Sequence, residues 1–302
     1  MDASFPPRVL AIFGPTASGK TAVAEAVADR VDGELVSADA MQVYRGLAIL
    51  TNQSPRPTRL VGIWPLSHEA SVAEYAQLAH AAVDDILAAG RLPIVVGGTG
   101  LYLRAALAEL KLPPAPGAGE RARWERLYDV EGPDRAHQLL AGHDPAAAAV
   151  VHPNDRRRVV RALELAAAGT SLRPQDDRLW SERTRWPSLV VGLDVPKDEL
   201  ARRIERRTAE IFERGVEDEV RRALAERISS TAEHVHGLRE IATLPREEAI
   251  AGMNAQMRKY AAYQRKWMRR TPNIVVLDAD RTPAAVAEEI VGLVGERVAG
   301  VR

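Results

Sequence analysis

Eight residues near the N-terminus combine glycine, lysine and threonine in the spacing of a phosphate-binding loop. The segment GPTASGKT fits the pattern G-x-x-x-x-G-K-[ST] at every position. Its glycines allow a tight turn that directs backbone N–H groups at phosphate oxygens, and a following helix would add partial positive charge. The lysine would neutralise phosphate charge, and the final threonine hydroxyl would bind a phosphate-associated Mg²⁺. We predict a site for a di- or triphosphate, such as that of a nucleotide. Its residues are Gly14, Pro15, Thr16, Ala17, Ser18, Gly19, Lys20 and Thr21.

The surroundings of this segment are those that a phosphate loop needs. The apolar run 9–13 before it predicts a buried strand, and residues 21–31 after it have helical spacing. These flanks favour a phosphate site over a chance glycine-rich turn. The motif alone leaves the reaction open, because one fold serves many chemistries.

An acidic side chain follows the second predicted strand. Asp39 comes soon after the apolar segment 34–37, and ligands of open α/β sheets bind beyond the carboxyl ends of strands. A carboxylate facing a diphosphate is unfavourable unless it has a task, such as accepting a proton from a nucleophile. The alternative is an Asp that starts a turn by accepting from nearby backbone N–H groups, and position alone favours neither. Met41 and Gln42 could contact a substrate or only shape the loop.

A glycine-rich turn follows the third predicted strand. Gly97, Gly98 and Gly100 would let another segment approach the site closely, and Thr99 offers a hydroxyl. Taken alone, this segment is best interpreted as an ordinary strand-to-helix turn.

Short apolar runs alternate with helical patterns over much of the chain. Five runs are continuously apolar and rich in β-branched residues, as is typical of parallel strands covered on both faces. They are residues 9–13, 34–37, 93–98, 189–195 and 273–279. The alternation predicts an α/β fold with a P-loop NTPase-like parallel-sheet core.

The alternation stops after residue 112. A Pro/Gly-rich segment predicts a hinge there, and residues 119–168 have helical patterns with no strand candidate. We predict a helical insertion domain at 113–186, between two parts of the core at 1–112 and 187–302. Later helical stretches are expected at 197–227 and 247–270.

Composition limits the class of protein. The chain has 302 residues with 41 basic and 41 acidic side chains, so its zero net charge argues against indiscriminate coating of nucleic acid. The absence of cysteine excludes disulfides, thiolate metal sites and a cysteine nucleophile. No stretch approaches the ~18 apolar residues of a membrane span, and no signal peptide is evident. We expect a cytoplasmic monomer with no membrane partner.

The ordered set of motifs resembles one family. GPTASGKT, SADAMQVYRGL with TNQSP, IVVGGTGLYLRAAL, HPNDRRRVVRALEL and MRKYAAYQRKWMRR occur in the order typical of bacterial tRNA dimethylallyltransferases, the IPP transferase family. The resemblance runs from about residue 8 to about residue 278. It implies transfer of a dimethylallyl group from dimethylallyl diphosphate to the exocyclic amine of the adenosine 3′-adjacent to the anticodon, with release of diphosphate. The phosphate loop would then hold a leaving group and need not hold ATP.

The resemblance also implies roles for single residues. Asp39 matches the carboxylate that takes the amine proton, while Arg207 and Thr21 with Mg²⁺ match groups that stabilise the leaving diphosphate. Thr99 matches a residue at the junction of RNA and diphosphate. The expected catalytic residues are therefore Asp39, Thr21 and Arg207. Contacts with the tRNA anticodon loop are expected from Asp39, Ala40, Met41, Gln42, Thr99, Arg121, Arg157, Arg158 and Arg161.

Basic segments could bind the RNA once the adenine leaves its stack, a step that costs roughly a few kcal/mol. The arginines in 152–161 could bind RNA phosphates. Alternatively, they could be ordinary solvated side chains at the start of a helix. Residues 255–270 hold six basic side chains and no acid. Their Tyr260, Tyr263 and Trp267 share one helical face, which we interpret as core, so the opposite basic face is the better RNA candidate.

The chain departs from the family pattern at several positions. Ala40 replaces the usual serine, Leu238 follows Gly237 in place of tyrosine, and Ala262-Tyr263 replaces a Lys/Arg pair. The stretch 54–70 is shortened. These changes affect substrate contacts more than the expected catalytic set.

Three other functions are compatible with parts of the sequence. A prenyltransferase acting on free adenine nucleotide would share the phosphate loop and the base, but would need neither the insertion nor the late basic segment. A small-molecule kinase would need the phosphate loop, yet no Arg-rich lid is evident. A non-catalytic RNA-binding module would need neither Lys20 nor Asp39.

Overall fold

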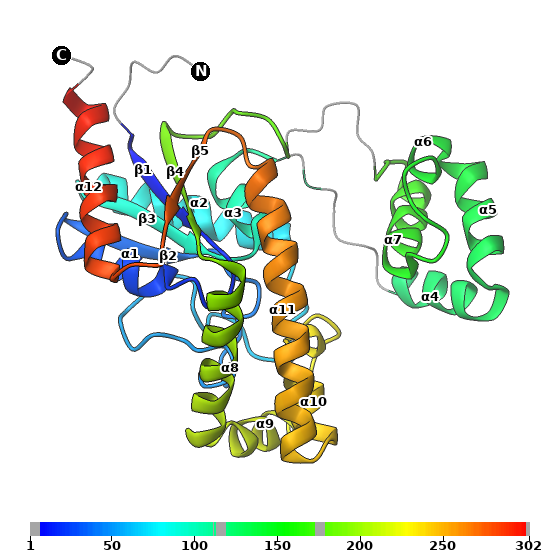
Figure 1. The fold of residues 1–302 in the computed structure, drawn as a ribbon. Coiled ribbons are helices and arrows are strands. Elements are labelled where there is room, and N and C mark those ends of the chain that lie inside the picture. Colours follow the sequence, from blue (N-terminus) through cyan, green and yellow to red (C-terminus); the bar gives the residue numbers. More distant parts are fainter. Residues whose placement is uncertain (1–6, 111, 113–118, 173–178, 300–302) are drawn as a thin grey trace. The chain divides into compact units, whose positions relative to one another are not determined.

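The structure is a computed structural model that describes residues 7–110, 112, 119–172 and 179–299 (Figure 1). It divides into two compact units. The first comprises the chain up to Glu109 and from Trp180 onward, and the second comprises Leu110–Leu179. The second unit ends before the predicted boundary at 186, because the chain that follows already binds the first unit. The backbone N–H of Arg185 donates to the Leu107 carbonyl at 2.7 Å.

A five-stranded parallel sheet forms the centre of the first unit, as predicted. Its order is β2-β3-β1-β4-β5, so the first strand lies in the middle. The strands pair in register; Ile12, for example, stands opposite Val96 on one side and Val191 on the other. Their bounds are β1 Val9–Phe13, β2 Gly33–Ser37, β3 Leu92–Gly97, β4 Ser188–Asp194 and β5 Ile274–Asp278.

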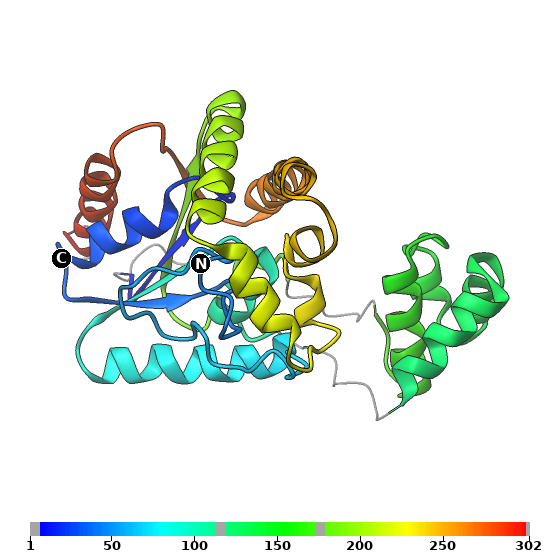
Figure 2. The same cartoon turned by 90° about the horizontal axis from the view of Figure 1, so that it is seen from below.

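Helices cover both faces of this sheet, which is why its inner strands are largely apolar and buried. Every residue of β1 is fully buried. Helices α1 (Lys20–Ala28) and α12 (Pro283–Ala299) pack together on one face, and α2 (Val72–Ala88) and α3 (Gly100–Leu107) pack together on the other (Figure 2). The apolar contacts on both faces fix the carboxyl ends of the strands, where the site forms.

The later helical stretches flank the carboxyl ends of the strands. The predicted helix 197–227 is two helices, because Gly215 adopts a left-handed backbone with φ of 83°. These are α8 (Lys197–Glu213) and α9 (Val216–Leu224). A 3₁₀ turn (Ala232–His234), α10 (Leu238–Thr243) and the long α11 (Arg246–Arg270) follow, and α11 packs against both α8 and α3.

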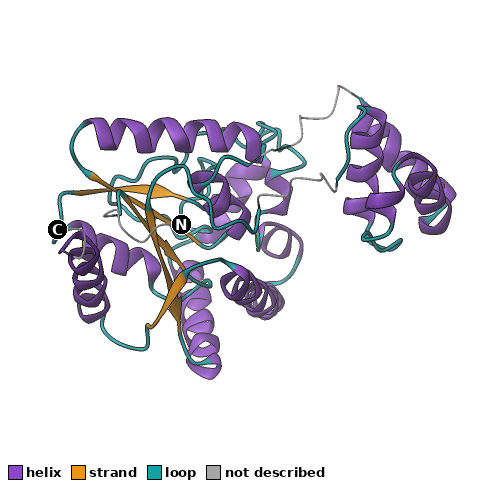
Figure 3. Ribbon diagram, turned by 90° about the horizontal axis from the view of Figure 1, so that it is seen from above, coloured by secondary structure: helices purple, strands orange, loops and turns teal. Residues whose placement is uncertain are grey.

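The described residues of the second unit form helices joined by loops and turns, with no strand among them (Figure 3). Its helices are α4 (Glu120–Glu131), α5 (Pro133–His143), α6 (Pro145–Ala148) and α7 (Arg156–Ala167). Asp144 and Asp155 cap two of them, each accepting a hydrogen bond from a backbone N–H of the first turn. Apolar side chains from α4, α5 and α7 form a separate small core, which includes Trp124, Leu140 and Val159.

Among the described residues, no helix combines the length and the apolar character that crossing a bilayer requires.

Candidate active site

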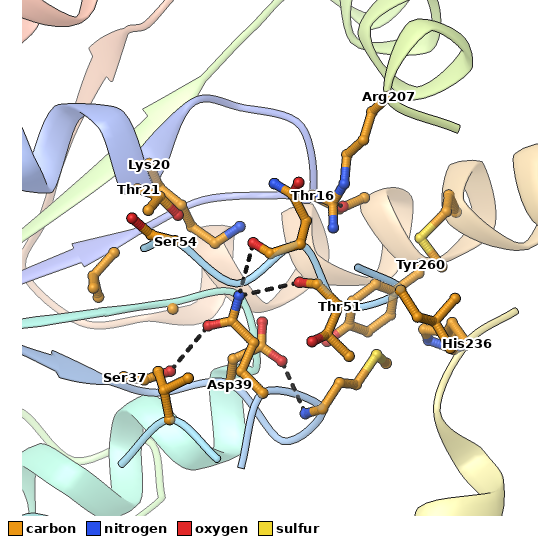
Figure 4. Close-up of a pocket in the computed structure, with 18 of the residues that line it drawn as sticks. Thr16, Lys20, Thr21, Ser37, Asp39, Thr51, Ser54, Arg207, His236 and Tyr260 are labelled. Atoms are coloured by element: carbon orange, nitrogen blue, oxygen red, sulfur yellow. Dashed lines mark hydrogen bonds between the residues drawn. The ribbon is translucent and has the colours of Figure 1, made fainter. Parts of the chain in front are cut away.

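A cavity lies at the carboxyl ends of the sheet strands in the first unit (Figure 4). It is lined by the phosphate loop, by the segment after β2, by α8 and by α11. The three residues predicted to be catalytic, Asp39, Thr21 and Arg207, all line it. The topology therefore brings together groups that are far apart in the sequence.

The phosphate loop turns tightly between β1 and α1. Ala17 and Gly19 both have left-handed backbone conformations, with φ of 63° and 85°. The Ser18 N–H donates to the Pro15 carbonyl at 3.2 Å, and α1 begins directly at Lys20. The unpaired N–H groups of this helix start and its partial positive charge are available to an anion. This is the geometry expected from the motif.

Two cations of the cavity stand in a desolvated environment. The Lys20 ammonium donates to the Pro15 carbonyl at 3.4 Å, and Arg207 Nη1 donates to Thr16 Oγ1 at 3.0 Å. Burial lowers the pKa of Lys20 to about 8; the Asp39 carboxylate opposes this shift and Arg207 adds to it. Burial also lowers the pKa of Arg207. Two cations that repel each other and lack full hydration favour the binding of a multivalent anion.

Asp39 fits both interpretations of its sequence position. One carboxylate oxygen, Oδ1, accepts the backbone N–H of Met41 at 2.9 Å, which is the turn-forming contact. The side chain also lines the cavity, and its charge acts on Lys20 and Arg207. The turn contact thus orients a carboxylate that remains available to a ligand.

The other residues expected after β2 divide into two groups. Met41 and Gln42 line the cavity, and Gln42 Nε2 donates to the Thr51 carbonyl at 3.1 Å. Ala40 and Thr99 are outside the described cavity lining, but they bind each other: the Ala40 N–H donates to Thr99 Oγ1 at 3.1 Å. This contact fixes the backbone next to Asp39.

The glycine-rich turn after β3 is more than an ordinary strand-to-helix turn. A Cβ atom on Gly97 would lie 2.1 Å from the Ala38 carbonyl oxygen, and one on Gly98 would lie 2.2 Å from Gln264 Nε2. At Gly100 a Cβ atom would lie 2.3 Å from the Trp267 ring. The missing side chains let the loop before Asp39 and helix α11 come close to the site.

Gln264 is a structural link that the motifs did not identify. Its Oε1 accepts the Thr16 N–H at 2.7 Å, and its Nε2 donates to the Gly98 carbonyl at 2.8 Å. The residue is buried and lines the cavity. It therefore ties α11 to the phosphate loop and to the turn after β3. The signal that could have found it was an uncharged amide within a strongly basic helix.

The aromatic face of α11 is only partly core, which corrects the prediction. Trp267 packs against Gly100 but is only partly buried. Tyr260 lines the cavity instead, and its hydroxyl lies 3.2 Å from Thr99 Oγ1. Burial raises the pKa of Tyr260, so its hydroxyl stays protonated. Tyr263 is 53% exposed.

The predicted RNA-binding arginines of the second unit pair with acidic neighbours. Arg121 forms an ion pair with Glu125 at 3.2 Å and Arg158 one with Asp155 at 3.6 Å. Arg161 binds Glu164, whose side chain is buried, at 3.0 Å. Arg157 is exposed. The Arg121 and Arg158 pairs are solvent-accessible and therefore weak, so an RNA phosphate can replace their acidic partners at little cost, whereas the pair of Arg161 with the buried Glu164 is costly to break.

Comparison with known proteins identifies the family. The model of the IPP transferase family matches residues 42–271, and the isopentenyl transferase model matches residues 7–63. The tRNA dimethylallyltransferase of Corynebacterium jeikeium is 37% identical over 98% of this chain and all of its own length. The enzyme of the same name from Acidothermus cellulolyticus is 40% identical, over 90% of this chain and 89% of its own.

A solved structure agrees with these sequence matches. The tRNA isopentenylpyrophosphate transferase of Bacillus halodurans superimposes with a TM-score of 0.68 at 32% identity, covering 96% of this chain and 97% of its own. The fold is therefore P-loop NTPase-like, as predicted. From the family model, the near full-length relatives and this fold, we conclude that the chain belongs to the IPP transferase family.

Proposed function

We propose that the chain transfers a dimethylallyl group from dimethylallyl diphosphate to the exocyclic amine of the adenosine 3′-adjacent to the anticodon in tRNA, and releases diphosphate. The relatives compared above are named tRNA dimethylallyltransferases, which supports transfer of a dimethylallyl group to tRNA. The observation that carries the proposal is one cavity in which Asp39 faces the cations Lys20 and Arg207. Neither a phosphate site alone nor a carboxylate alone would suit this reaction.

The reaction needs two groups at opposite ends of the reacting atoms. The bond between C1 of the dimethylallyl group and the diphosphate oxygen breaks, and that oxygen keeps the electron pair. Lys20, Arg207 and the N–H groups of the phosphate loop would stabilise this growing negative charge. The adenine nitrogen bonds to C1 and loses one proton, which Asp39 would accept. The products are the prenylated adenine, diphosphate and a protonated Asp39.

The chain offers a site for Mg²⁺ at the end of the phosphate loop. The Thr21 hydroxyl lines the cavity beside Lys20 and would bind the ion together with diphosphate oxygens and water. Among the described residues, no group of three or more His, Asp or Glu side chains could hold a metal ion. That fits an ion held mainly by its substrate. Bound there, Mg²⁺ would neutralise part of the leaving-group charge.

The target adenine must leave the anticodon stack to enter this cavity, at a cost of roughly a few kcal/mol. Met41 and Gln42 at the cavity wall would contact the extruded nucleotide, and Arg121, Arg157, Arg158 and Arg161 would bind backbone phosphates. We expect the enzyme to act as a cytoplasmic monomer.

One incubation tests this function. The protein is mixed with Mg²⁺, labelled dimethylallyl diphosphate and either tRNA or AMP, and the labelled product is mapped by nuclease digestion and mass spectrometry. Label on the adenosine next to the anticodon of tRNA, with none on AMP, supports the proposal. Label on AMP would instead indicate a free-nucleotide prenyltransferase. Label on neither would contradict prenyl transfer and leave a kinase or an RNA-binding module.

A further inference from the structure

His236 is a cavity residue with no part in the mechanism above. It follows the 3₁₀ turn, and its side chain lines the same cavity as Asp39 and Tyr260 (Figure 4). Its ring packs on that of Tyr260, with ring centroids 4.6 Å apart and planes tilted by 59°. The Gly237 N–H donates to Gln256 Oε1 at 3.0 Å, which fixes the backbone next to it. The ring is thus held in place as part of the cavity wall.

One polar atom of this ring is unsatisfied. Nδ1 is buried and has no hydrogen-bond partner among the described residues. An imidazole that only filled space against Tyr260 would bury a nitrogen at a cost that an apolar side chain avoids. A polar group left without a partner beside a substrate cavity is therefore best explained by a partner on the substrate.

The charge state of the ring decides what it can offer. Burial lowers the pKa of His236, while the Asp39 carboxylate acts in the opposite direction with a smaller effect. The ring is therefore neutral near pH 7, and a neutral imidazole has one nitrogen that accepts a hydrogen bond and one that donates. A third cation beside Lys20 and Arg207 is avoided, and the cavity gains a hydrogen-bond acceptor.

Building on the proposed function, we propose that a ring nitrogen of His236 accepts a hydrogen bond from the exocyclic amine of the target adenine. This amine carries two hydrogens. One passes to Asp39 as the nitrogen bonds to C1 of the dimethylallyl group, and the other stays on the product nitrogen. An acceptor for the retained hydrogen would hold the amine between Asp39 and His236, so that its lone pair points at C1. His236 would then bind the nucleophile directly.

Two substitutions separate this role from packing. His236→Phe keeps a planar ring against Tyr260 and removes both nitrogens, whereas His236→Gln keeps an amide that can accept a hydrogen bond. His234→Phe, at an exposed histidine two positions earlier, is the matched control. The measurement is the single-turnover rate of prenylation of an anticodon stem–loop RNA at saturating dimethylallyl diphosphate. Thermal melting of each variant and its affinity for inorganic diphosphate are measured alongside.

We expect His236→Phe to slow the single turnover by about tenfold or more with diphosphate affinity and melting little changed, since a neutral hydrogen bond to the amine is lost. His236→Gln should recover most of the rate, and His234→Phe should match the wild type. A wild-type rate in His236→Phe would overturn the inference, as would equal losses in the Phe and Gln variants with intact melting. Failure of the proposed function itself looks different, because the wild-type chain would then label no RNA.

Discussion

The molecule carries two sets of positive charge that differ in how they are held. In the cavity, Lys20 and Arg207 are desolvated and have lowered pKa values, and among the described residues their side chains donate hydrogen bonds to neutral oxygens of the phosphate loop. In the second unit, the half-exposed Arg121 and the exposed Arg158 form ion pairs with acids at most four residues away. Both sets belong to segments that resemble the same family. Their energetics nevertheless predict different behaviour.

The difference shows what each set is suited to do. Desolvated cations that form no ion pair within the described residues bind an anion strongly at one position, as charge stabilisation in a transition state requires. Exposed, locally paired arginines can exchange partners and contribute through many weak, salt-dependent contacts, as RNA-backbone binding requires. The cavity should therefore control the rate, and the second unit should control RNA affinity. The predictions below test this division.

The largest expected effect is on the rate when a cavity cation is removed. Arg207→Met should lower kcat by about 10²–10³, because one preorganised donor to the leaving group is lost. Arg202→Met, on the exposed side of the same helix, is the matched control, with a side chain that is 71% exposed. Steady-state prenylation of tRNA measures both. Equal kcat values for the two variants would contradict the claim that cavity cations control the rate and surface cations do not.

A second prediction compares glycines of the two units by the free energy of unfolding. Gly97→Ala should destabilise the fold by about 1–3 kcal/mol or more, because the added Cβ would lie 2.1 Å from the Ala38 carbonyl oxygen. Gly142→Ala, in α5 of the second unit, places its Cβ in open space and should stabilise that helix by about 0.5–1 kcal/mol. Urea unfolding followed by circular dichroism gives both values. The prediction is wrong if the two substitutions shift stability in the same direction.

The third prediction concerns pH. Lys20, with its pKa lowered to about 8, is charged below that pH and neutral above it. The affinity for inorganic diphosphate should therefore fall as pH rises through and beyond about 8, by up to about tenfold per pH unit. Bound diphosphate raises the pKa of the lysine, so the loss of affinity begins near pH 8 and levels off above the raised pKa of the complex. Calorimetric titrations from pH 7 to 10 follow the trend, and Lys20→Met should remove it.

The smallest effect is expected for the arginines of the second unit. Arg157→Ala with Arg158→Ala should reduce the slope of log affinity for tRNA against log salt by about 0.7 for each lost phosphate contact. The kcat at saturating tRNA should stay unchanged. Arg161 is left intact because its partner Glu164 is buried, and removing it would risk the fold. Filter binding across a salt series measures the slope. An unaltered slope would show that these two residues do not contact RNA phosphates.

Much of the first unit could be predicted because its signals are local. All five strands were identified from apolar runs, which a strand buried on both faces needs; the edge strand β5 has such a run although its Val276 is 52% exposed. The phosphate loop is likewise a contiguous motif, and the structure shows the expected turn. The break at Gly215 was missed, because a single glycine in a helical pattern does not by itself show a left-handed backbone.

The rest of the site depends on contacts between distant residues. Gln264 binds Thr16 across 248 positions of the chain, and no local pattern reveals that pairing. The residue pattern around Tyr260 predicts only a helix. The pattern around His236 predicts no contact with a distant cavity. The sequence also could not decide between the two interpretations of Asp39, because one oxygen makes the turn and the side chain still reaches the cavity.

The most direct test of the account is the chemical step in Asp39→Asn. Asparagine keeps the shape of the side chain and an oxygen that can accept the Met41 N–H, but it cannot take a proton at neutral pH. Single-turnover prenylation of tRNA and binding of inorganic diphosphate are measured on the same preparation. We predict that the transfer rate falls by about 10²–10⁴ while diphosphate affinity is retained. A wild-type transfer rate would contradict the claim that this carboxylate receives the amine proton.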